Sequence, residues 1–311
     1  MADFFPVPDG YRDQERSPQR LAWCDWLPRL AATLADRWGL TPDGEPMYGF
    51  LSFVWPVRDR AARPLMLKVH DFSAGADGER LALEAARRPA LVELVASDPG
   101  QNALLLERLD STRRLETMAD VDAACEVIGD LVAQISAHDA PPEMRSMATE
   151  LDRLHASTTA MLDRTPDVMP RLRAERALET MGALAEELRA TSGPLPLVHG
   201  DAHYLNVLHT LPGEEPRWVA IDPLPAAGYP EWEVAAVLRN RWSDAAATAD
   251  PERALRRRFD ILCERADLNH DRALRLVHAI AVDNVLWLAR DDNAHPVAKE
   301  FIHPYSIVAR W

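Results

Sequence analysis

The sequence predicts an α+β protein with two lobes, a small lobe built on an antiparallel sheet and a large helical lobe. Apolar and β-branched runs typical of strands gather between residues 50 and 109, whereas apolar residues recur at helical spacing from residue 120 onward. A chain that passes from strands to helices in this way is typical of the α+β class. We expect the small lobe at 1–106, a hinge at 107–110 and the large lobe at 111–311.

The strands and helices of the small lobe follow one another in a clear order. Residues 21–38 have helical spacing and end at Gly39. Phe50–Val57 and Pro64–Val69 read as an antiparallel hairpin around a charged turn. Glu79–Arg88 reads as a short helix and Ala103–Leu109 as a buried strand.

The large lobe is predicted to be mostly helical. Helices are expected from Asp120, through 143–190 and from Trp232 to about Arg290. Pro194–Val198 and Trp218–Ile221 are short apolar runs that read as strands on either side of a Pro-Gly turn.

Composition and charge exclude several classes of protein. The chain has 311 residues, 47% of them hydrophobic, which is enough for a substantial core. Its 49 acidic and 35 basic residues give a net charge of -14, which disfavours nucleic acid and favours a small cationic partner, although acidity can also serve solubility alone. No apolar run approaches the roughly 18 residues that a membrane span needs. Three widely spaced cysteines without a metal pattern indicate reduced thiols, so we expect a cytoplasmic protein without a membrane partner.

The loop after the predicted strand Pro194–Val198 concentrates polar groups that suit a metal ion and a hydroxyl. Asp201 and Asn206 lie five residues apart, and Asp222 directly follows the second strand. If the two strands pair across the turn, Asp222 returns close to Asn206. A carboxylate and an amide oxygen are hard ligands that suit Mg²⁺.

Asp201 is then left without a metal to bind. A carboxylate beside an attacking hydroxyl can orient it and accept its proton, as phosphoryl transfer requires. Taken singly, each of these aspartates reads as a turn or cap residue. Taken together, their spacing favours a kinase site.

Lys68 is a second indication of this chemistry. The chain has two lysines against 33 arginines, and one of the two lies inside an apolar strand. A compact ammonium there can contact nucleotide phosphates and pair with a helix carboxylate, for which Glu79 is the first candidate and Glu84 the second. The alternative is a lysine that extends to solvent from an edge strand.

Two further segments are candidates for nucleotide contacts. A turn at Gly49 to Ser52 would let backbone amides approach phosphates. The segment 104–109, including Glu107 and Leu109, offers backbone groups that could meet an adenine edge. A plain buried strand explains that segment equally well.

The order of these parts resembles the aminoglycoside phosphotransferases, most closely their streptomycin 6-kinase and hydroxyurea-kinase branch. The likeness covers nearly the whole chain and is carried by stretches at residues 49–57, 104–110, 199–208, 218–242, 256–262 and 283–287. The resemblance implies a bilobal protein-kinase-like fold, ATP or GTP with Mg²⁺, and a cationic antibiotic bound against the C-terminal helices.

The same resemblance implies individual roles. Asp201 takes the position of the catalytic base, Asn206 and Asp222 those of the metal ligands and Lys68 that of the lysine that contacts phosphate. His199 is expected to buttress the catalytic turn.

The chain departs from the branch at two positions. Tyr229 follows Gly228 where an acidic residue is common, and Glu233 stands where Asp is usual. Glu233 is expected to brace the catalytic loop. Candidate substrate-facing positions, which solvated helix faces explain just as well, are Glu231, Asp283, Asn284, Trp287, Asp291 and Asp292.

Three functions remain in competition at this point. The first is an O-phosphotransferase that inactivates an aminoglycoside, with a streptomycin-like acceptor. The second is a kinase of the same fold acting on hydroxyurea, a peptide antibiotic or a metabolite alcohol. The third is a non-catalytic nucleotide-binding module, which the intact Lys68, Asp201, Asn206 and Asp222 disfavour.

Overall fold

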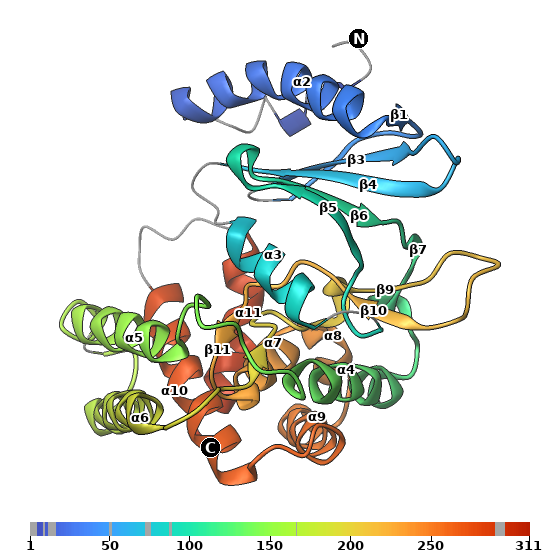
Figure 1. Cartoon of the computed structure of the whole chain (residues 1–311). Helices are drawn as coiled ribbons and strands as arrows, with labels where there is room; N and C mark the ends of the chain where they lie inside the picture. Colours follow the sequence, from blue (N-terminus) through green and yellow to red (C-terminus); the bar gives the residue numbers. More distant parts are fainter. Residues whose placement is uncertain are drawn as a thin grey trace. The chain divides into compact units, whose positions relative to one another are not determined.

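A computed structural model describes residues 5–8, 10–11, 17–49, 52–71, 76–86, 89–165, 167–289 and 296–311. The chain divides into two compact units (Figure 1). The first comprises Met1–Asp110 with Thr210–Pro216, and the second Ser111–His209 with Arg217–Trp311. No helix in the described ranges is long and apolar enough to cross a membrane.

The first unit is built on a six-stranded sheet with antiparallel pairing throughout. Its strands are β1 (Thr41–Pro42), β2 (Met47–Tyr48), β3 (Ser52–Arg58), β4 (Pro64–His70), β5 (Leu94–Asp98) and β6 (Ala103–Glu107). The order is β1-β3-β4-β6-β5, and β2 also pairs with β3. The hairpin predicted from the sequence is confirmed in β3 and β4, whose turn is closed by Asp59 Oδ1 accepting from the backbone N–H groups of Ala61 and Arg63, each at 2.9 Å.

Helix α2 (Pro18–Trp38) covers one face of this sheet (Figure 1). Its buried side chains, including Trp23 and Leu27, share a core with Phe53, Trp55 and other inward-facing residues of β3 and β4. The Ser17 hydroxyl accepts from the Arg20 N–H, and Gly39 ends the helix in the left-handed conformation, φ 66°. The predicted helix over 21–38 is therefore confirmed.

Three strands of the first unit were not predicted from the sequence: β5 and the two-residue strands β1 and β2. Helix α3 (Ala76–Ala85) confirms the short helix, although residues 87–88 lie outside the described chain. Strand β6 confirms the predicted buried strand. Strand β5 was not predicted because it is short, carries polar residues and has a register shift between Leu94 and Ala96.

The second unit is mainly helical, as predicted. Its helices are α4 (Val121–Ser136), α5 (Met147–Leu162), α6 (Arg171–Ala190), α7 (Glu233–Arg239), α8 (Trp242–Ala246), α9 (Pro251–Arg265), α10 (His270–Leu288) and α11 (Pro296–Val308). Helices α5, α6 and α10 pack together around a core that includes Leu151, Leu184 and Leu276. Side chains of Asp120, Ser146, Asp250 and Asn269 cap α4, α5, α9 and α10 by accepting from first-turn N–H groups.

Short strands between α6 and α7 carry the predicted site. These strands are β8 (Leu197–Val198), β9 (Val207–His209), β10 (Trp218–Ala220) and β11 (Ala226–Ala227). Strand β9 lies between β10 and β7 (Asp110–Arg114), while β8 pairs with β11. The pairing considered from the sequence, 194–198 with 218–221, is wrong: β10 pairs instead with β9, a three-residue strand too short to recognise by periodicity.

Candidate active site

The His-Gly-Asp turn after β8 depends on a glycine. Gly200 has φ 83°, and a Cβ at this position would lie 2.1 Å from the carbonyl oxygen of Leu224. The Leu224 N–H donates to the His199 carbonyl at 2.8 Å, so the two segments run in direct contact. Only glycine fits such a close approach with a positive φ.

His199 ties this turn to the end of β10. Its Nε2 lies 3.1 Å from the Ile221 carbonyl oxygen, and its Nδ1 accepts from the Asp201 N–H at 3.3 Å. These partners assign the proton to Nε2. Burial lowers the pKa of His199 to about 4, so the ring is neutral at physiological pH.

Glu233 braces the same turn from the first residue of α7. Its Oε1 accepts from the Gly200 N–H at 2.6 Å and its Oε2 from the Ala202 N–H at 3.0 Å. Burial raises the pKa of Glu233 to about 7, although both N–H groups act to lower it. The backbone on both sides of Asp201 is thereby fixed by one carboxylate.

The Asp201 carboxylate is surrounded by donors. Its Oδ1 lies 2.6 Å from Arg239 Nη2, and its Oδ2 lies 3.2 Å from Asn206 Nδ2 and 3.4 Å from His203 Nε2. Burial acts to raise the pKa of Asp201, but His203 and Arg239 outweigh it and the net shift is downward. The carboxylate is therefore ionised at neutral pH.

Asn206 and Asp222 are brought together by the β9–β10 connection. The Ile221 N–H donates to the Asn206 carbonyl at 2.9 Å, so Asp222 follows directly beside Asn206. Asp222 has φ 56°, a left-handed conformation that is uncommon outside glycine and tends to occur at functional sites.

This arrangement fits a magnesium ion held jointly with a nucleotide. The Asn206 Nδ2 donates to the carbonyl oxygen and to Oδ2 of Asp201, at 3.0 Å and 3.2 Å. These two bonds determine which end of the amide is the nitrogen, and the amide oxygen lies at the other end. One amide oxygen and one carboxylate are the donor types that Mg²⁺ takes from proteins when phosphates complete its shell. Within the described ranges, no group of three or more His, Cys, Asp or Glu side chains could hold a metal unaided.

Lys68 and Glu79 form a buried ion pair in the first unit. Lys68 Nζ donates to Oε1 and Oε2 of Glu79 at 2.9 Å and 2.7 Å, and His70 Nε2 lies 2.8 Å from Glu79 Oε2. Burial acts to raise the pKa of Glu79, but Lys68 and His70 outweigh it and hold this pKa at about 2. The second sequence candidate, Glu84, is engaged by Arg80 instead.

The predicted nucleotide-contact segments have different outcomes. Gly49 donates its N–H to the Ser52 carbonyl at 3.0 Å and closes the turn between β2 and β3; residues 50–51 lie outside the described chain. Glu107 donates its N–H to the Glu93 carbonyl, also at 3.0 Å. The sheet therefore already uses this N–H, and a contact of the other backbone groups of 104–109 with an adenine edge stays a prediction. Leu109 is buried just beyond β6.

Two of the predicted substrate-facing residues point into the protein. Glu231 is buried and accepts from the Asn269 N–H at 3.0 Å, so it supports the start of α10. Asp283 is buried and accepts from the Thr158 hydroxyl at 3.0 Å. Their burial corrects the expectation that these carboxylates face a ligand.

The remaining substrate-facing candidates stay predictions. Asn284 donates to the Ile280 carbonyl within α10, and the Trp287 side chain is exposed. Asp291 and Asp292 lie outside the described residues. The unusual Tyr229 is buried beneath the Arg272 guanidinium, 4.2 Å from its ring centroid.

Arg239 and His203 reach Asp201 without having been predicted. His203 lies in the stretch 199–208 that carries the resemblance, two residues from the predicted base, and this was the available signal. Arg239 carried no such signal, because it is one of 33 arginines and lies 38 positions from Asp201.

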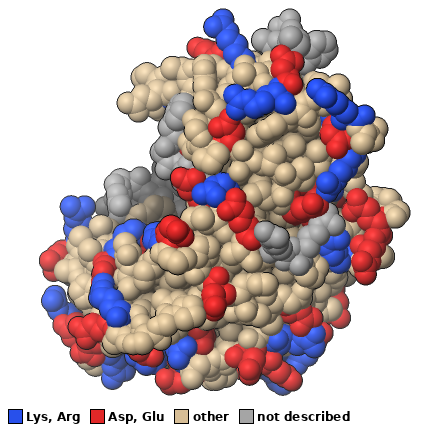
Figure 2. Space-filling model, in the orientation of Figure 1, with Lys and Arg blue, Asp and Glu red and all other residues tan. Residues whose placement is uncertain are grey.

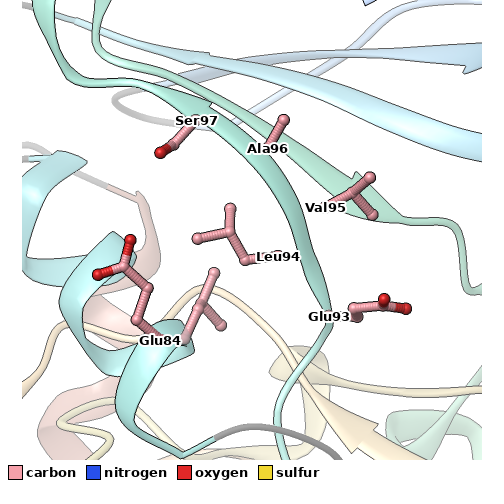
Figure 3. Close-up of a pocket in the computed structure, with 7 residues that line it drawn as sticks. Glu84, Glu93, Leu94, Val95, Ala96 and Ser97 are labelled. Atoms are coloured by element: carbon pink, nitrogen blue, oxygen red, sulfur yellow. The ribbon is translucent and has the colours of Figure 1, made fainter.

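The first unit also has a groove of about 540 Å³ between α3 and the edge strand β5. Figure 3 shows Glu84 on α3 and Leu94 on β5 on its two facing sides. The two carboxylates of its lining, Glu84 and Glu93, are already paired with Arg80 and Arg63 at 2.8 Å and 2.6 Å. Among the described residues that line the groove, both carboxylates are therefore compensated by arginines.

Comparison with known proteins defines the class. An aminoglycoside phosphotransferase solved with ADP and hygromycin B matches with a TM-score of 0.57 at 17% identity, covering 89% of this chain and 97% of that one. The fold is thus that of the protein-kinase-like phosphotransferases, with a small antiparallel sheet and a large helical part.

The chain belongs to the aminoglycoside/hydroxyurea antibiotic resistance kinase family, whose model matches residues 37–292. It is 35% identical to a streptomycin 6-kinase of Streptomyces glaucescens over 280 residues, 88% of this chain and 86% of that protein. It is 33% identical to a hydroxyurea phosphotransferase of Kitasatospora aureofaciens over 269 residues, 85% of this chain and 74% of that protein. The protein is therefore a phosphotransferase.

Proposed function

We propose that the protein transfers the terminal phosphoryl group of ATP or GTP to a hydroxyl of a streptomycin-like aminoglycoside. The observation that carries this proposal is the Asp201 carboxylate, ionised and fixed beside Asn206 and Asp222. The likeness to streptomycin 6-kinases supports the choice of acceptor.

Asp201 orients the acceptor hydroxyl and receives its proton. As the hydroxyl oxygen forms its bond to the terminal phosphorus, the bond from that phosphorus to the nucleoside diphosphate breaks. The proton passes to the carboxylate and later to solvent. His199 and Glu233 contribute by holding the backbone of the turn in place.

Lys68, Asn206 and Asp222 hold the nucleotide. The Lys68 ammonium, aligned by Glu79, contacts phosphate oxygens, and Gly49 and Ser52 lie in a turn that can approach them. Asn206 and Asp222 would hold Mg²⁺, which neutralises charge on the phosphates when bound. In this proposal residues 1–106 form the nucleotide-binding lobe, 107–110 the hinge, where Leu109 offers backbone groups to the base, and 111–311 the catalytic lobe.

A cationic acceptor agrees with the charge of the chain. A net charge of -14 attracts polycationic molecules and raises their encounter rate. Phosphorylation then adds negative charge and bulk to the drug and weakens its fit to its target. The three cysteines are buried thiols and none of them is part of a disulfide, which supports a reducing compartment, and we propose the cytoplasm.

A second candidate acceptor is hydroxyurea. The observation that favours it is the 33% identity to a hydroxyurea phosphotransferase, close to the value for the streptomycin 6-kinase.

An acceptor panel tests the proposal. The purified protein is incubated with Mg-ATP or Mg-GTP and streptomycin, other aminoglycosides or hydroxyurea, and the products are examined for the mass gain of one phosphoryl group. We expect transfer to streptomycin. Transfer to hydroxyurea alone would favour the second candidate, and nucleotide binding without any turnover would contradict both.

Replacement of the proposed base gives a second test. Asp201→Asn is expected to lower kcat by more than about 1,000-fold while nucleotide affinity stays within about threefold, because the carboxylate acts on the acceptor. The matched control is Asp130→Asn, at a partly exposed aspartate that is paired with Arg265. A fully active Asp201→Asn enzyme would show that another group is the base.

A further inference from the structure

We propose that Arg239 is a positioning residue for the Asp201 carboxylate, and that Arg258 holds Arg239 in place. This inference rests on the proposed role of Asp201. It adds to that role two arginines, one from α7 and one from α9, that do not touch the acceptor themselves.

Helix α7 holds Asp201 from both of the helix ends. Glu233, the first residue of this seven-residue helix, accepts from the N–H groups of Gly200 and Ala202. Arg239, its last residue, donates to Asp201 Oδ1 at 2.6 Å. The backbone around Asp201 and its side chain are thereby both held by the same helix, α7.

The contact with Arg239 also determines how the carboxylate is turned. With Oδ1 bound to the guanidinium, Oδ2 is directed to Asn206 Nδ2 and His203 Nε2. Donors on both oxygens fix the plane of the group. A carboxylate fixed in this way loses little freedom when an acceptor hydroxyl arrives, which lowers the barrier to transfer.

The Arg239 side chain packs against α11 and stays partly exposed. Its guanidinium carbon lies 5.6 Å from the centroid of the Phe301 ring, and Tyr305 is a second neighbour, both from α11. The side chain is 28% exposed, and Tyr305 is almost fully buried. Arg239 therefore has few alternative rotamers.

Arg258 fixes the turn that follows Arg239. Its Nη1 donates to the carbonyl oxygens of Asn240 and Arg241 at 3.2 Å and 3.1 Å, and its Nη2 to that of Arg241 at 3.2 Å. Arg241 has φ 53°, a left-handed conformation that needs such support. Arg258 is only 3% exposed, so its donors serve this turn. Because Arg258 lies within residues 256–262, this contact explains how that stretch supports the turn after Arg239.

The test compares Arg239→Met and Arg239→Lys with Arg257→Met. Arg257 is exposed, lies in α9 and pairs with Asp122, so its replacement is the matched control. We expect Arg239→Met to lower kcat by about 100-fold, with the KM values for nucleotide and acceptor within about threefold of wild type. Arg239→Lys, which keeps one charged donor, should lose only about tenfold, and Arg257→Met should match wild type.

Arg258→Lys extends the test to the second arginine. Its ammonium cannot span both carbonyls, so we expect kcat to fall by about tenfold with unchanged KM values. Melting temperatures are measured for all four variants. Wild-type kcat in Arg239→Met would overturn the proposal, as would equal losses in the Met and Lys variants, or losses that follow melting temperature or KM.

The design separates this inference from the proposed acceptor. Slow hydrolysis of the nucleotide, in which water is the acceptor, is followed in the same samples. Hydrolysis that depends on Arg239, without transfer to any aminoglycoside or hydroxyurea, would contradict the acceptor and support the inference. Absence of both reactions in the wild type would contradict both.

Discussion

Asp201 is held in place by groups that are not adjacent to it in sequence. The residues that contact it include Arg239, Asn206 and His203, and its backbone neighbours are held by Glu233. Each of these partners supplies a hydrogen-bond donor or acceptor. Replacing one partner leaves the other group without its hydrogen bond, which costs about 1–3 kcal/mol of stability for a neutral buried group. The site is therefore sensitive to changes in residues that never meet a substrate.

Gly200 gives a direct test of the turn. Gly200→Ala is expected to destabilise the protein by more than about 2 kcal/mol, because the new Cβ would lie 2.1 Å from a backbone oxygen at a positive φ. Urea unfolding measures the change. The control is Gly182→Ala in α6, where nothing lies within 4 Å and an alanine should stabilise the helix by up to about 1 kcal/mol. Equal stability of the two variants would contradict this account of the turn.

The raised pKa of Glu233 predicts that the stability of the protein depends on pH. Its pKa is about 7 in the folded protein against the ordinary value of 4.5, so between these values the folded state holds a proton that the unfolded state has lost. The contribution of this group is thus greatest below pH 4.5 and is lost as the pH rises through 7. From pH 5 to pH 8, the stability of the wild type relative to Glu233→Gln should fall by about 2–3 kcal/mol.

Urea unfolding of both proteins at the two pH values tests this prediction. Glu233→Asp, which keeps a carboxylate on a stem one methylene shorter, is the companion variant for activity. A stability difference that is the same at pH 5 and pH 8 would show that the pKa of Glu233 is not raised.

At the scale of elements, strand β4 and helix α3 are joined through one buried ion pair. Lys68 and Glu79 are 3% exposed each, and Glu79 also meets His70 from the same strand. A buried pair contributes little net stability compared with apolar residues. Loss of one partner is nevertheless costly, because the other charge then stays buried without a counter-charge. The pair therefore fixes α3 against the sheet.

Breaking this pair should affect both folding and nucleotide use. Glu79→Gln is expected to cost about 3–5 kcal/mol of stability and to lower kcat/KM for nucleotide by at least about tenfold, because Lys68 loses its alignment. Glu84→Gln, on the same helix with its side chain 47% exposed, should change neither. The measurements are urea unfolding and steady-state kinetics. Comparable effects of the two substitutions would contradict the assignment of Glu79.

At the scale of the whole molecule, the chain carries a net charge of -14. On the face shown in Figure 2, acidic and basic side chains are interspersed instead of forming one patch. Many acidic and basic side chains of the described residues form ion pairs, such as Arg171 with Glu175 and Arg265 with Asp130. Exposed pairs of this kind contribute little stability, so the charge acts mainly through its long-range field.

Salt should therefore separate the two candidate acceptors. For streptomycin, kcat/KM is expected to fall several-fold as ionic strength rises from about 50 mM to about 500 mM, because screening removes the attraction of a cation. For hydroxyurea, which is neutral, it should change little. Initial rates at low acceptor concentration measure both, and the same salt response for the two acceptors would exclude electrostatic steering.

The order of elements and the loop that carries the proposed base could be predicted from the sequence because both depend on local patterns. Apolar periodicity gave α2, the β3–β4 hairpin and the long helices. Spacing within the loop pointed to Asp201, Asn206 and Asp222. These patterns predict the structure well because residues that are close in sequence are also close in the folded protein.

Only the tertiary structure decided which distant residues meet. It brought Arg239 to Asp201 across 38 positions, chose Glu79 over Glu84 for Lys68, and paired β10 with β9. It also buried Glu231 and Asp283, which sequence alone could not distinguish from exposed carboxylates. The physical reason is that such contacts follow from how helices and strands pack, and neither periodicity nor residue type records that packing.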